Sequence, residues 1–134
     1  MQIAVRIAGD ADAEAVESHR RAALLEATSY RGHLDPTASP SGSSAVVLVD
    51  GSVVGSAGYS DHDDVRHITH LFVMKECREV GAGDALMVWL VNGAQDAGLL
   101  AVRASALPGD RSTKNLFERH GLVARAIQVE RKLR

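Results

Sequence analysis

Several residue types that mark whole classes of protein are scarce in this 134-residue chain. Cys77 is the only cysteine, which excludes an internal disulfide and a thiolate-rich zinc site. Aromatic residues make up 4%, too few for a base-stacking platform. The 15 basic residues are outnumbered by 17 acidic ones, which is not the balance of a protein that binds duplex nucleic acid. The longest purely apolar run, 85–91, is too short to span a bilayer.

The beginning of the chain also lacks the features of a secretory signal. Acidic residues follow residues 1–6 at Asp10, Asp12 and Glu14, and no long apolar core comes after a basic start. We therefore expect a cytoplasmic protein with neither a membrane nor a nucleic acid as partner. The composition, with 46% hydrophobic and 24% charged residues, is that of an ordinary globular protein. The length suits a single domain over residues 1–134.

Hydrophobic periodicity predicts nine elements in the order strand, helix, three strands, helix, strand, helix, strand. The strands are expected near 2–8, 45–49, 52–59, 66–74, 99–105 and 122–133, and the helices near 11–29, 82–97 and 108–120. The Asp50-Gly51 pair is a strong hairpin signal, so the central strands should be antiparallel. The strands on either side of the second helix should be parallel. The expected fold class is α/β, a mixed sheet of about six strands with helices on both faces.

The segment from residue 71 to 84 carries the clearest chemical signal. A strand ends, a short loop follows, and a long helix begins at Gly81 and Gly83. Unpaired N–H groups and the positive end of the helix dipole suit an anion there, and Arg78 adds a mobile positive group. The alternative is a loop whose glycines only relieve steric strain. There is no Gly-Lys-Ser/Thr sequence and only two of the three Rossmann glycines, so neither phosphate fingerprint fits.

A third pattern does fit. Arg78-x-x-Gly81-x-Gly83 resembles the Arg/Gln-x-x-Gly-x-Gly/Ala signature of the GNAT N-acetyltransferase superfamily. The preceding Leu71-x-Val73 resembles the end of that family's fourth strand, and 115–122 resembles its penultimate helix. The order of the elements matches the family along nearly the whole chain. The resemblance implies a single GNAT-like domain that takes acetyl-CoA as cosubstrate.

The resemblance also implies which residues hold acetyl-CoA. In the family, the loop and the helix start bind the pyrophosphate, the fourth strand pairs with the pantetheine arm, and the penultimate helix borders the thioester. Carried over to this chain, the cofactor-binding residues are Phe72, Val73, Arg78, Glu79, Val80, Gly81, Ala82, Gly83, Asp84, Asn115 and Phe117.

Three positions depart from the family pattern. Lys75 stands where a proline is common, which should affect only rigidity. Glu79 stands where a glycine commonly follows the arginine, and its carboxylate must point away from the pyrophosphate or weaken binding. Phe117 stands where many members have a tyrosine that protonates the departing CoA thiolate. Another group or water must do this here, or the step needs no acid.

The chemistry calls for a base that accepts a proton from the attacking amine. His67 and His70 lie on the strand that leads into the loop, where some family members keep a glutamate base. Spaced by three residues, they face opposite sides of an ideal strand, so at most one should face the cleft. We select His70 as the catalytic base because it is nearer to Phe72. The same opposed faces argue against a metal site shared with His62 and the neighbouring acids, and no metal is expected.

The acceptor is less defined. The family resemblance puts its cleft near the first helix, at His19 and the arginines after it, and near the segment that follows; the residues of that segment are Tyr30, Arg31, His33 and Asp35. A solvated helix face is the competing interpretation of His19, Arg20 and Arg21.

The predicted function is transfer of an acetyl group from acetyl-CoA to a primary amine of an unidentified small-molecule or peptide acceptor, by direct attack on the thioester. A non-catalytic acyl-CoA-binding regulatory module is the alternative, and a nucleotide-phosphate binder is a third hypothesis. The sequence does not decide whether the protein forms a homodimer.

Overall fold

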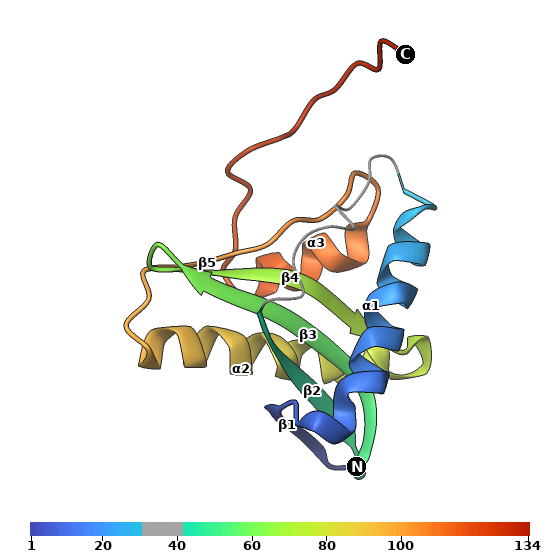
Figure 1. The fold of residues 1–134 in the computed structure, drawn as a ribbon, viewed down its shortest axis with the longest axis vertical. Coiled ribbons are helices and arrows are strands. Elements are labelled where there is room, and N and C mark those ends of the chain that lie inside the picture. Colours follow the sequence, from blue (N-terminus) through green and yellow to red (C-terminus); the bar gives the residue numbers. More distant parts are fainter. Residues whose placement is uncertain (31–41) are drawn as a thin grey trace.

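The structure is a computed structural model that describes residues 1–30 and 42–134 (Figure 1). Five strands, three α-helices and two short 3-10 helices follow one another. Their bounds are β1 Ile3–Ile7, η1 Asp10–Asp12, α1 Ala13–Ala27, β2 Ser43–Val49, β3 Ser52–His62, β4 Val65–Val73, η2 Lys75–Val80, α2 Ala82–Asp96, β5 Ala101–Arg103 and α3 Arg111–Arg119. In the described ranges, no helix combines the length and the apolar character needed to cross a membrane.

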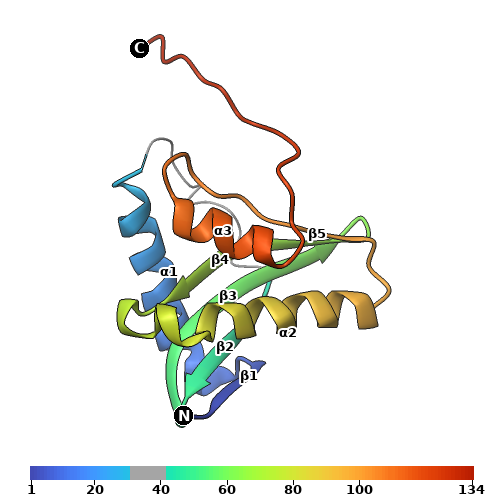
Figure 2. The same cartoon turned by 180° about the vertical axis from the view of Figure 1, so that it is seen from behind.

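The strands form one mixed sheet in the order β1-β2-β3-β4-β5. The first three pairings are antiparallel, and β4 and β5, which flank α2, are parallel. Both predictions from the sequence are confirmed. Figures 1 and 2 show α1 on one face of the sheet and α2 on the other, so the expected helices on both faces are also present.

Two tight turns set the register of the central strands. Asp50 and Gly51 join β2 to β3, and Asp63 and Asp64 join β3 to β4, and all four have positive φ angles. Consecutive residues with positive φ match the right-handed twist of a hairpin, which explains why Asp-Gly and Asp-Asp occur here. β3 is longer than the strand expected over 52–59, because Asp61 and His62 still pair with β4.

The α2 face of the sheet holds the dry core. Leu86, Met87 and Leu90 have no solvent exposure and pack against Ala45, Val47 and other apolar side chains of β2, β3 and β4. The helix is apolar nearly all round, which is why it sits deep in the molecule. Close approach demands small residues as well: a Cβ on Gly93 would come within 2.9 Å of the Arg66 guanidinium.

The expected sixth strand is absent from the structure, which is a correction to the sequence prediction. Residues 123–134 are extended but have no regular secondary structure, and in Figure 1 they run away from the sheet. A strand needs a neighbouring chain to accept and donate its backbone hydrogen bonds. Residues 123–134 thus have the alternating hydrophobic pattern of a strand, but no described strand lies beside them to pair with.

Candidate functional site

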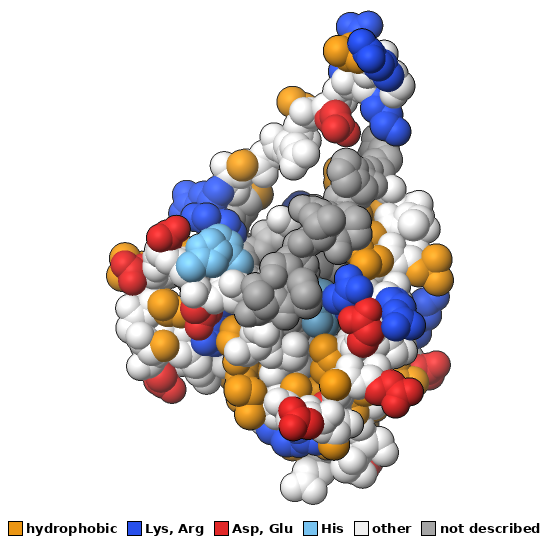
Figure 3. Space-filling view, in the orientation of Figure 1, with side chains coloured by type: hydrophobic (Ala, Val, Ile, Leu, Met, Phe, Trp, Pro, Cys, Tyr) orange, Lys and Arg blue, Asp and Glu red, His pale blue; other side chains and the backbone are white. Residues whose placement is uncertain are grey.

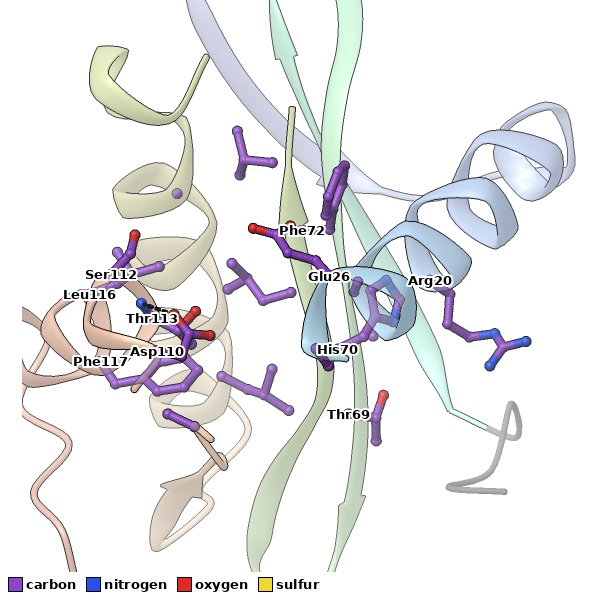
Figure 4. Close-up of a pocket in the computed structure, with 18 of the residues that line it drawn as sticks. Arg20, Glu26, Thr69, His70, Phe72, Asp110, Ser112, Thr113, Leu116 and Phe117 are labelled. Carbon is purple, nitrogen blue, oxygen red and sulfur yellow. Dashed lines mark hydrogen bonds between the residues drawn. The ribbon is translucent and has the colours of Figure 1, made fainter. Parts of the chain in front are cut away.

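A cavity of about 860 Å3 lies between α1, β4 and α3. Figure 4 shows α1 on one side of β4 and α3 on the other, with side chains from all three pointing into the space between. The cavity also reaches the loop after β4 and the first turn of α2, where Arg78, Gly83 and Asp84 line it. This size is within the range of small-molecule and cofactor sites.

A β-bulge in β4 shapes the wall of this cavity. His70 pairs with Gly58 and Ile68 pairs with Tyr59, so Thr69 is an extra residue without a partner in β3. All residues from Ile68 to Val73 line the cavity, and at the bulge the side chains of the successive residues Thr69 and His70 both lie on the Gly58 side (Figure 4). A Cβ at Gly58 would come within 2.6 Å of both side chains, so glycine is required opposite the bulge.

The bulge also corrects the expectation for the two histidines of β4. With one residue inserted between them, His67 and His70 lie on the same face of the sheet, not on opposite faces. Of these two histidines, His70 lines the cavity and His67 does not. His67 lies nearer the β3–β4 turn, where its ring stacks on His62 with 4.3 Å between ring centroids. Within residues 1–30 and 42–134, no three His, Cys, Asp or Glu side chains cluster as metal ligands would.

Behind the cavity wall, His70 begins a chain of three hydrogen-bonded side chains. His70 Nε2 is 3.3 Å from Ser56 Oγ, and Ser56 Oγ is 3.0 Å from His19 Nδ1. Ser56 is fully buried and His19 is 9% exposed. The His19 ring also packs on Phe72, with 5.4 Å between centroids. His19 is therefore buried behind the cavity wall and is not part of a solvated helix face.

Burial keeps both histidines neutral. It lowers the pKa of His70 to about 4; the positive charge of Arg20, and that of His19 when it is protonated, act in the same direction, whereas Glu17 acts against them. Burial likewise lowers the pKa of His19. A charged imidazole loses its hydration in this environment, and among the described residues both imidazoles hydrogen-bond to the Ser56 hydroxyl and not to a carboxylate. His70 is thus a weaker base than an imidazole of ordinary pKa.

The cofactor loop predicted from the sequence forms a 3-10 helix, η2, that turns into α2 at Gly81. Gly81 has φ +93°, a left-handed conformation that favours glycine and makes the sharp turn possible. No side chain caps the first turn of α2, so its N–H groups keep their donor capacity. Of the loop residues selected from the sequence, Arg78, Glu79, Gly83 and Asp84 line the cavity, whereas Val80, Gly81 and Ala82 are not in its wall.

Arg78 is not the mobile positive group that the sequence suggested. Its two terminal nitrogens each donate to Glu26 on α1 at 2.8 Å, and its Nε donates to the Val73 carbonyl at 2.7 Å. The guanidinium lies over the Phe72 ring as well, 5.4 Å from its centroid. The hydrogen bonds from Arg78 lower the pKa of Glu26, which keeps the carboxylate ionised. A ligand phosphate must therefore compete with Glu26 for this arginine.

The acidic residue in the first turn of α2 is also paired. His120 Nε2 lies 2.7 Å from Asp84 Oδ1, and Arg119 donates to the same carboxylate at 3.2 and 3.3 Å. The His120 contact is the largest cause of the lowered pKa of Asp84. Helix α3 is thus tied to the start of α2, and the negative charge of Asp84 is offset by its two basic neighbours.

Helix α3 closes the far side of the cavity. Asp110 caps it by accepting a hydrogen bond from the Thr113 N–H at 3.1 Å. Asn115 and the buried Phe117 line the cavity, and their place beside the thioester stays a prediction. Tyr30, from the expected acceptor region, lines it too. The other acceptor residues named from the sequence, Arg31, His33 and Asp35, lie outside the described residues.

Sequence reasoning missed Ser56 and Glu26, and it left open whether His19 lies near the cleft or on a solvated helix face. Val16, His19, Ala23 and Ala27 recur at spacings of three and four, so the signal for a buried histidine was present in the helical stripe. Ser56 carries no comparable signal, since a serine between small residues of a strand is common. The Glu26–Arg78 contact joins residues 52 positions apart, which no local pattern predicts.

Comparisons with known proteins agree with this geometry. The family model described as "Acetyltransferase (GNAT) family" matches residues 10–122. No curated protein sequence is significantly similar to the chain. The chain is similar in fold to a structure of AAC(6')-Iy with a bisubstrate analogue, CoA-S-monomethyl-acetylneamine, with 16% identity, 98% and 99% of the two chains covered and a TM-score of 0.68.

Two further solved structures have the same fold. One is an acetyltransferase from Pyrococcus furiosus, with 17% identity, 98% and 100% coverage and a TM-score of 0.73. The other is a transcriptional regulator from Bacillus halodurans, with 14% identity, 98% and 100% coverage and a TM-score of 0.74. Identities this low speak for the fold alone, but the family model covers most of the chain, and the chain belongs to the GNAT acetyltransferase family.

Proposed function

We propose that this protein transfers the acetyl group of acetyl-CoA to a primary amine, with the amine attacking the thioester carbonyl directly. One observation carries the proposal: a single cavity joins the first turn of α2 to the imidazole of His70. A long ligand bound at the helix start could therefore extend along β4 to a group that accepts a proton. Beyond His67, β4 is not paired with β5, so the edge of residues 68–73 is open toward the ligand.

In this proposal the pyrophosphate of acetyl-CoA lies against the N–H groups at the start of α2, where the helix dipole favours an anion. Arg78 exchanges Glu26 for a phosphate oxygen when the cosubstrate binds. Glu79 is in the wall of the same region, so its carboxylate must turn outward. Phe72 and Val73 flank the pantetheine arm, and Asn115 and Phe117 border the thioester from α3.

His70 is proposed as the group that receives the amine proton. Its Nε2 is engaged by Ser56, so Nδ1 is the nitrogen left for the acceptor. If Nε2–H donates to Ser56 Oγ, the serine hydroxyl donates to His19 Nδ1, and His70 Nδ1 carries a lone pair toward the amine. This direction of the hydrogen bonds makes Ser56 and His19 positioning residues, because they fix the tautomer of the base.

The low pKa of His70 keeps the imidazole able to accept a proton from the amine. With a pKa of about 4, the imidazole is neutral throughout the neutral range and does not compete for protons with solvent. The proton moves to it as the C–N bond forms and the nitrogen becomes acidic. Phe117 cannot protonate the departing thiolate. Because an ordinary thiol has a pKa of about 8.5, the thiolate leaves without a positioned acid.

The charge of the cavity wall indicates the class of acceptor but not its identity. Its described wall contains Glu17, Glu26, Glu79, Asp84 and Asp110 beside Arg20, Lys75, Arg78 and Arg119, a nearly even balance of charge. A polycation would be favoured by a strongly acidic wall. We therefore propose a small molecule or peptide with one reacting amine, and we use the aminoglycoside neamine as a comparison because a related fold binds a neamine derivative. The reaction is assigned to the cytoplasm.

An acyl-CoA-binding regulatory module is the second candidate. Two observations favour it: the arginine of the signature is already neutralised by Glu26, and Phe117 lacks the hydroxyl of many catalytic relatives. The module would bind acetyl-CoA without turning it over.

Two measurements separate these functions. Calorimetric titration with acetyl-CoA tests the cosubstrate site, and release of free thiol from acetyl-CoA in the presence of simple amines, peptides and neamine tests transfer. Binding together with amine-dependent thiol release supports acetyl transfer. Binding without release for any amine supports the regulatory module, and no binding of acetyl-CoA contradicts both.

A further inference from the structure

The part of the cavity around His70 has a floor of small and polar residues. Ser44, Gly58 and His70 lie in one row across β2, β3 and β4, because Ser44 pairs with Gly58 and Gly58 pairs with His70. All three line the cavity. Neighbouring strands are about 4.8 Å apart, so the row spans about 10 Å, which suits a small molecule. We call this region, with its walls, the acceptor end; its residues are Glu17, Arg20, Ser44, Gly58, Thr69 and His70.

Two polar atoms of the acceptor end lie together over Gly58. A Cβ on that glycine would come within 2.6 Å of both Thr69 Oγ1 and His70 Nδ1. His70 Nδ1 is the nitrogen left for the acceptor, because Nε2 is engaged by Ser56. The neighbouring Thr69 hydroxyl can donate a hydrogen bond to an oxygen next to the reacting amine. The geometry therefore suits an amine with an oxygen-bearing group a few bonds away.

The charges at the acceptor end sum to one positive unit. Arg20 donates to Glu17 at 2.8 and 3.0 Å, and Arg21 donates to the same carboxylate at 3.4 Å. The contact with Arg20 is the largest cause that lowers the pKa of Glu17 to about 2, so the carboxylate is ionised. Figure 3 shows basic side chains beside acidic ones over α1. The other acidic residues of the described wall lie at the cofactor loop and the helix ends beside it; they are Glu26, Glu79, Asp84 and Asp110.

Arg20 can turn toward a ligand at a smaller cost than Arg78. When Arg20 leaves, Glu17 keeps Arg21 as a partner, whereas both carboxylate oxygens of Glu26 bind Arg78. Figure 4 shows Arg20 on the side of the cavity away from α3, where Thr69 and His70 also lie. A guanidinium beside hydroxyl donors is the usual protein site for a carboxylate.

We propose that the acceptor is a small amine that carries a carboxylate, with its amine at His70 Nδ1 and its carboxylate on Arg20. The hydroxyls of Thr69 and Ser44 complete the carboxylate site. This inference rests on the proposed acetyl transfer and leaves the chemical step unchanged. The N–C bond forms, the C–S bond breaks, the amine proton passes to His70 and the sulfur leaves as a thiolate.

The same charges argue against two other classes of acceptor. A second ammonium group on the acceptor would lie near the positive charge of the acceptor end, so diamines and neamine should be poor acceptors. A phosphate at neutral pH carries a charge of about −1.5 to −2, which one unit of positive charge does not balance. A carboxylate matches the single unit.

The test is release of free thiol from acetyl-CoA with pairs of amines that differ in the carboxylate. Leucine is compared with leucinamide, which also represents the N-terminus of a peptide, and γ-aminobutyrate is compared with butylamine. We expect kcat/KM to be about tenfold higher, or more, for the carboxylate-bearing member of each pair. The amine of leucinamide is less basic than that of leucine, so a preference for leucine cannot come from a larger fraction of neutral amine.

Two arginine variants locate the carboxylate site. Arg20→Gln should raise the KM for leucine about tenfold and leave the KM for leucinamide and the affinity for acetyl-CoA nearly unchanged. Arg21→Gln is the matched control: it removes the same charge and another contact with Glu17, but the Arg21 side chain is 74% exposed and does not line the cavity. It should leave the KM for leucine within about twofold of the parent.

Calorimetric titration with N-acetylleucine, the expected product, gives a readout that does not depend on turnover. Thiol release that is as fast with leucinamide and butylamine as with their partners overturns the inference and leaves acetyl transfer standing. So does a preference for phosphoethanolamine over γ-aminobutyrate, or equal effects of Arg20→Gln and Arg21→Gln. Absence of release with every amine contradicts acetyl transfer. In that case binding of N-acetylleucine that weakens in Arg20→Gln alone supports the carboxylate site, and absence of such binding overturns it.

Discussion

The two faces of the sheet are built for different purposes. On the α2 face, Leu86, Met87 and Leu90 are fully buried among apolar side chains. On the α1 face, His19 and Ser56 are buried instead, and each has a hydrogen-bond partner. The same strands supply both faces, because alternate residues point in opposite directions.

This difference indicates that the α2 face mainly stabilises the fold, whereas the α1 face carries the groups that can take part in chemistry. The dry face gains from apolar burial, which depends on shape and volume. The polar face places ionisable groups where water is scarce, which costs stability but shifts their pKa values. Changes on the first face should therefore alter the free energy of unfolding, and changes on the second should alter ligand binding and rate.

The largest expected effect is a loss of stability when a residue of the dry α2 face is made smaller. Leu90→Ala should lower the free energy of unfolding by about 2–5 kcal/mol, because it leaves a cavity in a fully packed region. Urea unfolding followed by circular dichroism measures this. Val88→Ala on the same helix is the control, since Val88 is 48% exposed and should cost less than about 1 kcal/mol. A small effect at Leu90 would mean that the core is looser than the structure indicates.

The next effect concerns the polar face. His70→Gln should lower the turnover number about 100-fold, because the proton acceptor at the cavity wall is lost, while the Michaelis constant for acetyl-CoA changes little. His67→Gln is the matched control on the same strand and should behave as the parent. Equal activity of the two variants would leave the amine or an ordered water as the source of deprotonation.

A third effect is the dependence of stability on pH. The pKa of His70 is lowered to about 4 in the folded protein and is about 6.5 when unfolded. The unfolded chain therefore binds more protons between these values, so the stabilising contribution is complete above about pH 6.5 and is lost as the pH falls toward 4. Between about pH 6.5 and 5, before carboxylates titrate, the free energy of unfolding should fall by about 1–2 kcal/mol.

The measurement is a series of urea unfolding curves at fixed ionic strength. His70→Gln should reduce the slope over this interval, because the titrating group is gone. His19 contributes in the same direction, since burial lowers its pKa too. A parent protein whose stability is flat from pH 6.5 to 5 would show that the imidazoles are better hydrated than their burial suggests.

The smallest effect tests the ion pair at the mouth of the cofactor loop. Glu26→Gln should increase affinity for acetyl-CoA about threefold to tenfold, because it frees Arg78 and removes a negative charge near the phosphates. Glu17→Gln is the matched control: Glu17 also lines the cavity and pairs with an arginine, Arg20, but not with Arg78. Weaker binding in Glu26→Gln would show that the glutamate positions the arginine for the ligand.

The sequence was enough for most of the architecture but not for the details of the site. The hairpin at Asp50-Gly51 and the helix over residues 82–97 follow local rules, and both are present within a residue or two. The strand expected at residues 122–133 satisfied every local rule and still did not form, because pairing is not local. The bulge at Thr69 likewise depends on how two strands align, and it reversed the expected relation between His67 and His70.

For the glycines of the loop, the sequence pattern identified the positions but not the structural reason for each glycine. Gly81 was identified from its spacing and assigned to close approach of phosphates. Its positive φ shows a different need, a turn between two helices, so a bulky residue there would strain the backbone whether or not a ligand binds. Gly83 faces the cavity and is the better probe of ligand approach. The nearest contact of a Cβ there would be the tip of Leu116, at 3.3 Å, and the next side chain is Val73, at 4.0 Å.

The unpaired residue in β4 gives the strand a position at which its length can change. Ile68 and His70 pair with the consecutive residues Tyr59 and Gly58, so removing Thr69 would leave a regular ladder with residues 65–68 on their present faces. Arg66 would keep its contact with the Leu90 carbonyl. Related chains that keep the site should therefore tolerate a difference of one residue at the position of Thr69 as well as in the exposed turn at Asp63 and Asp64.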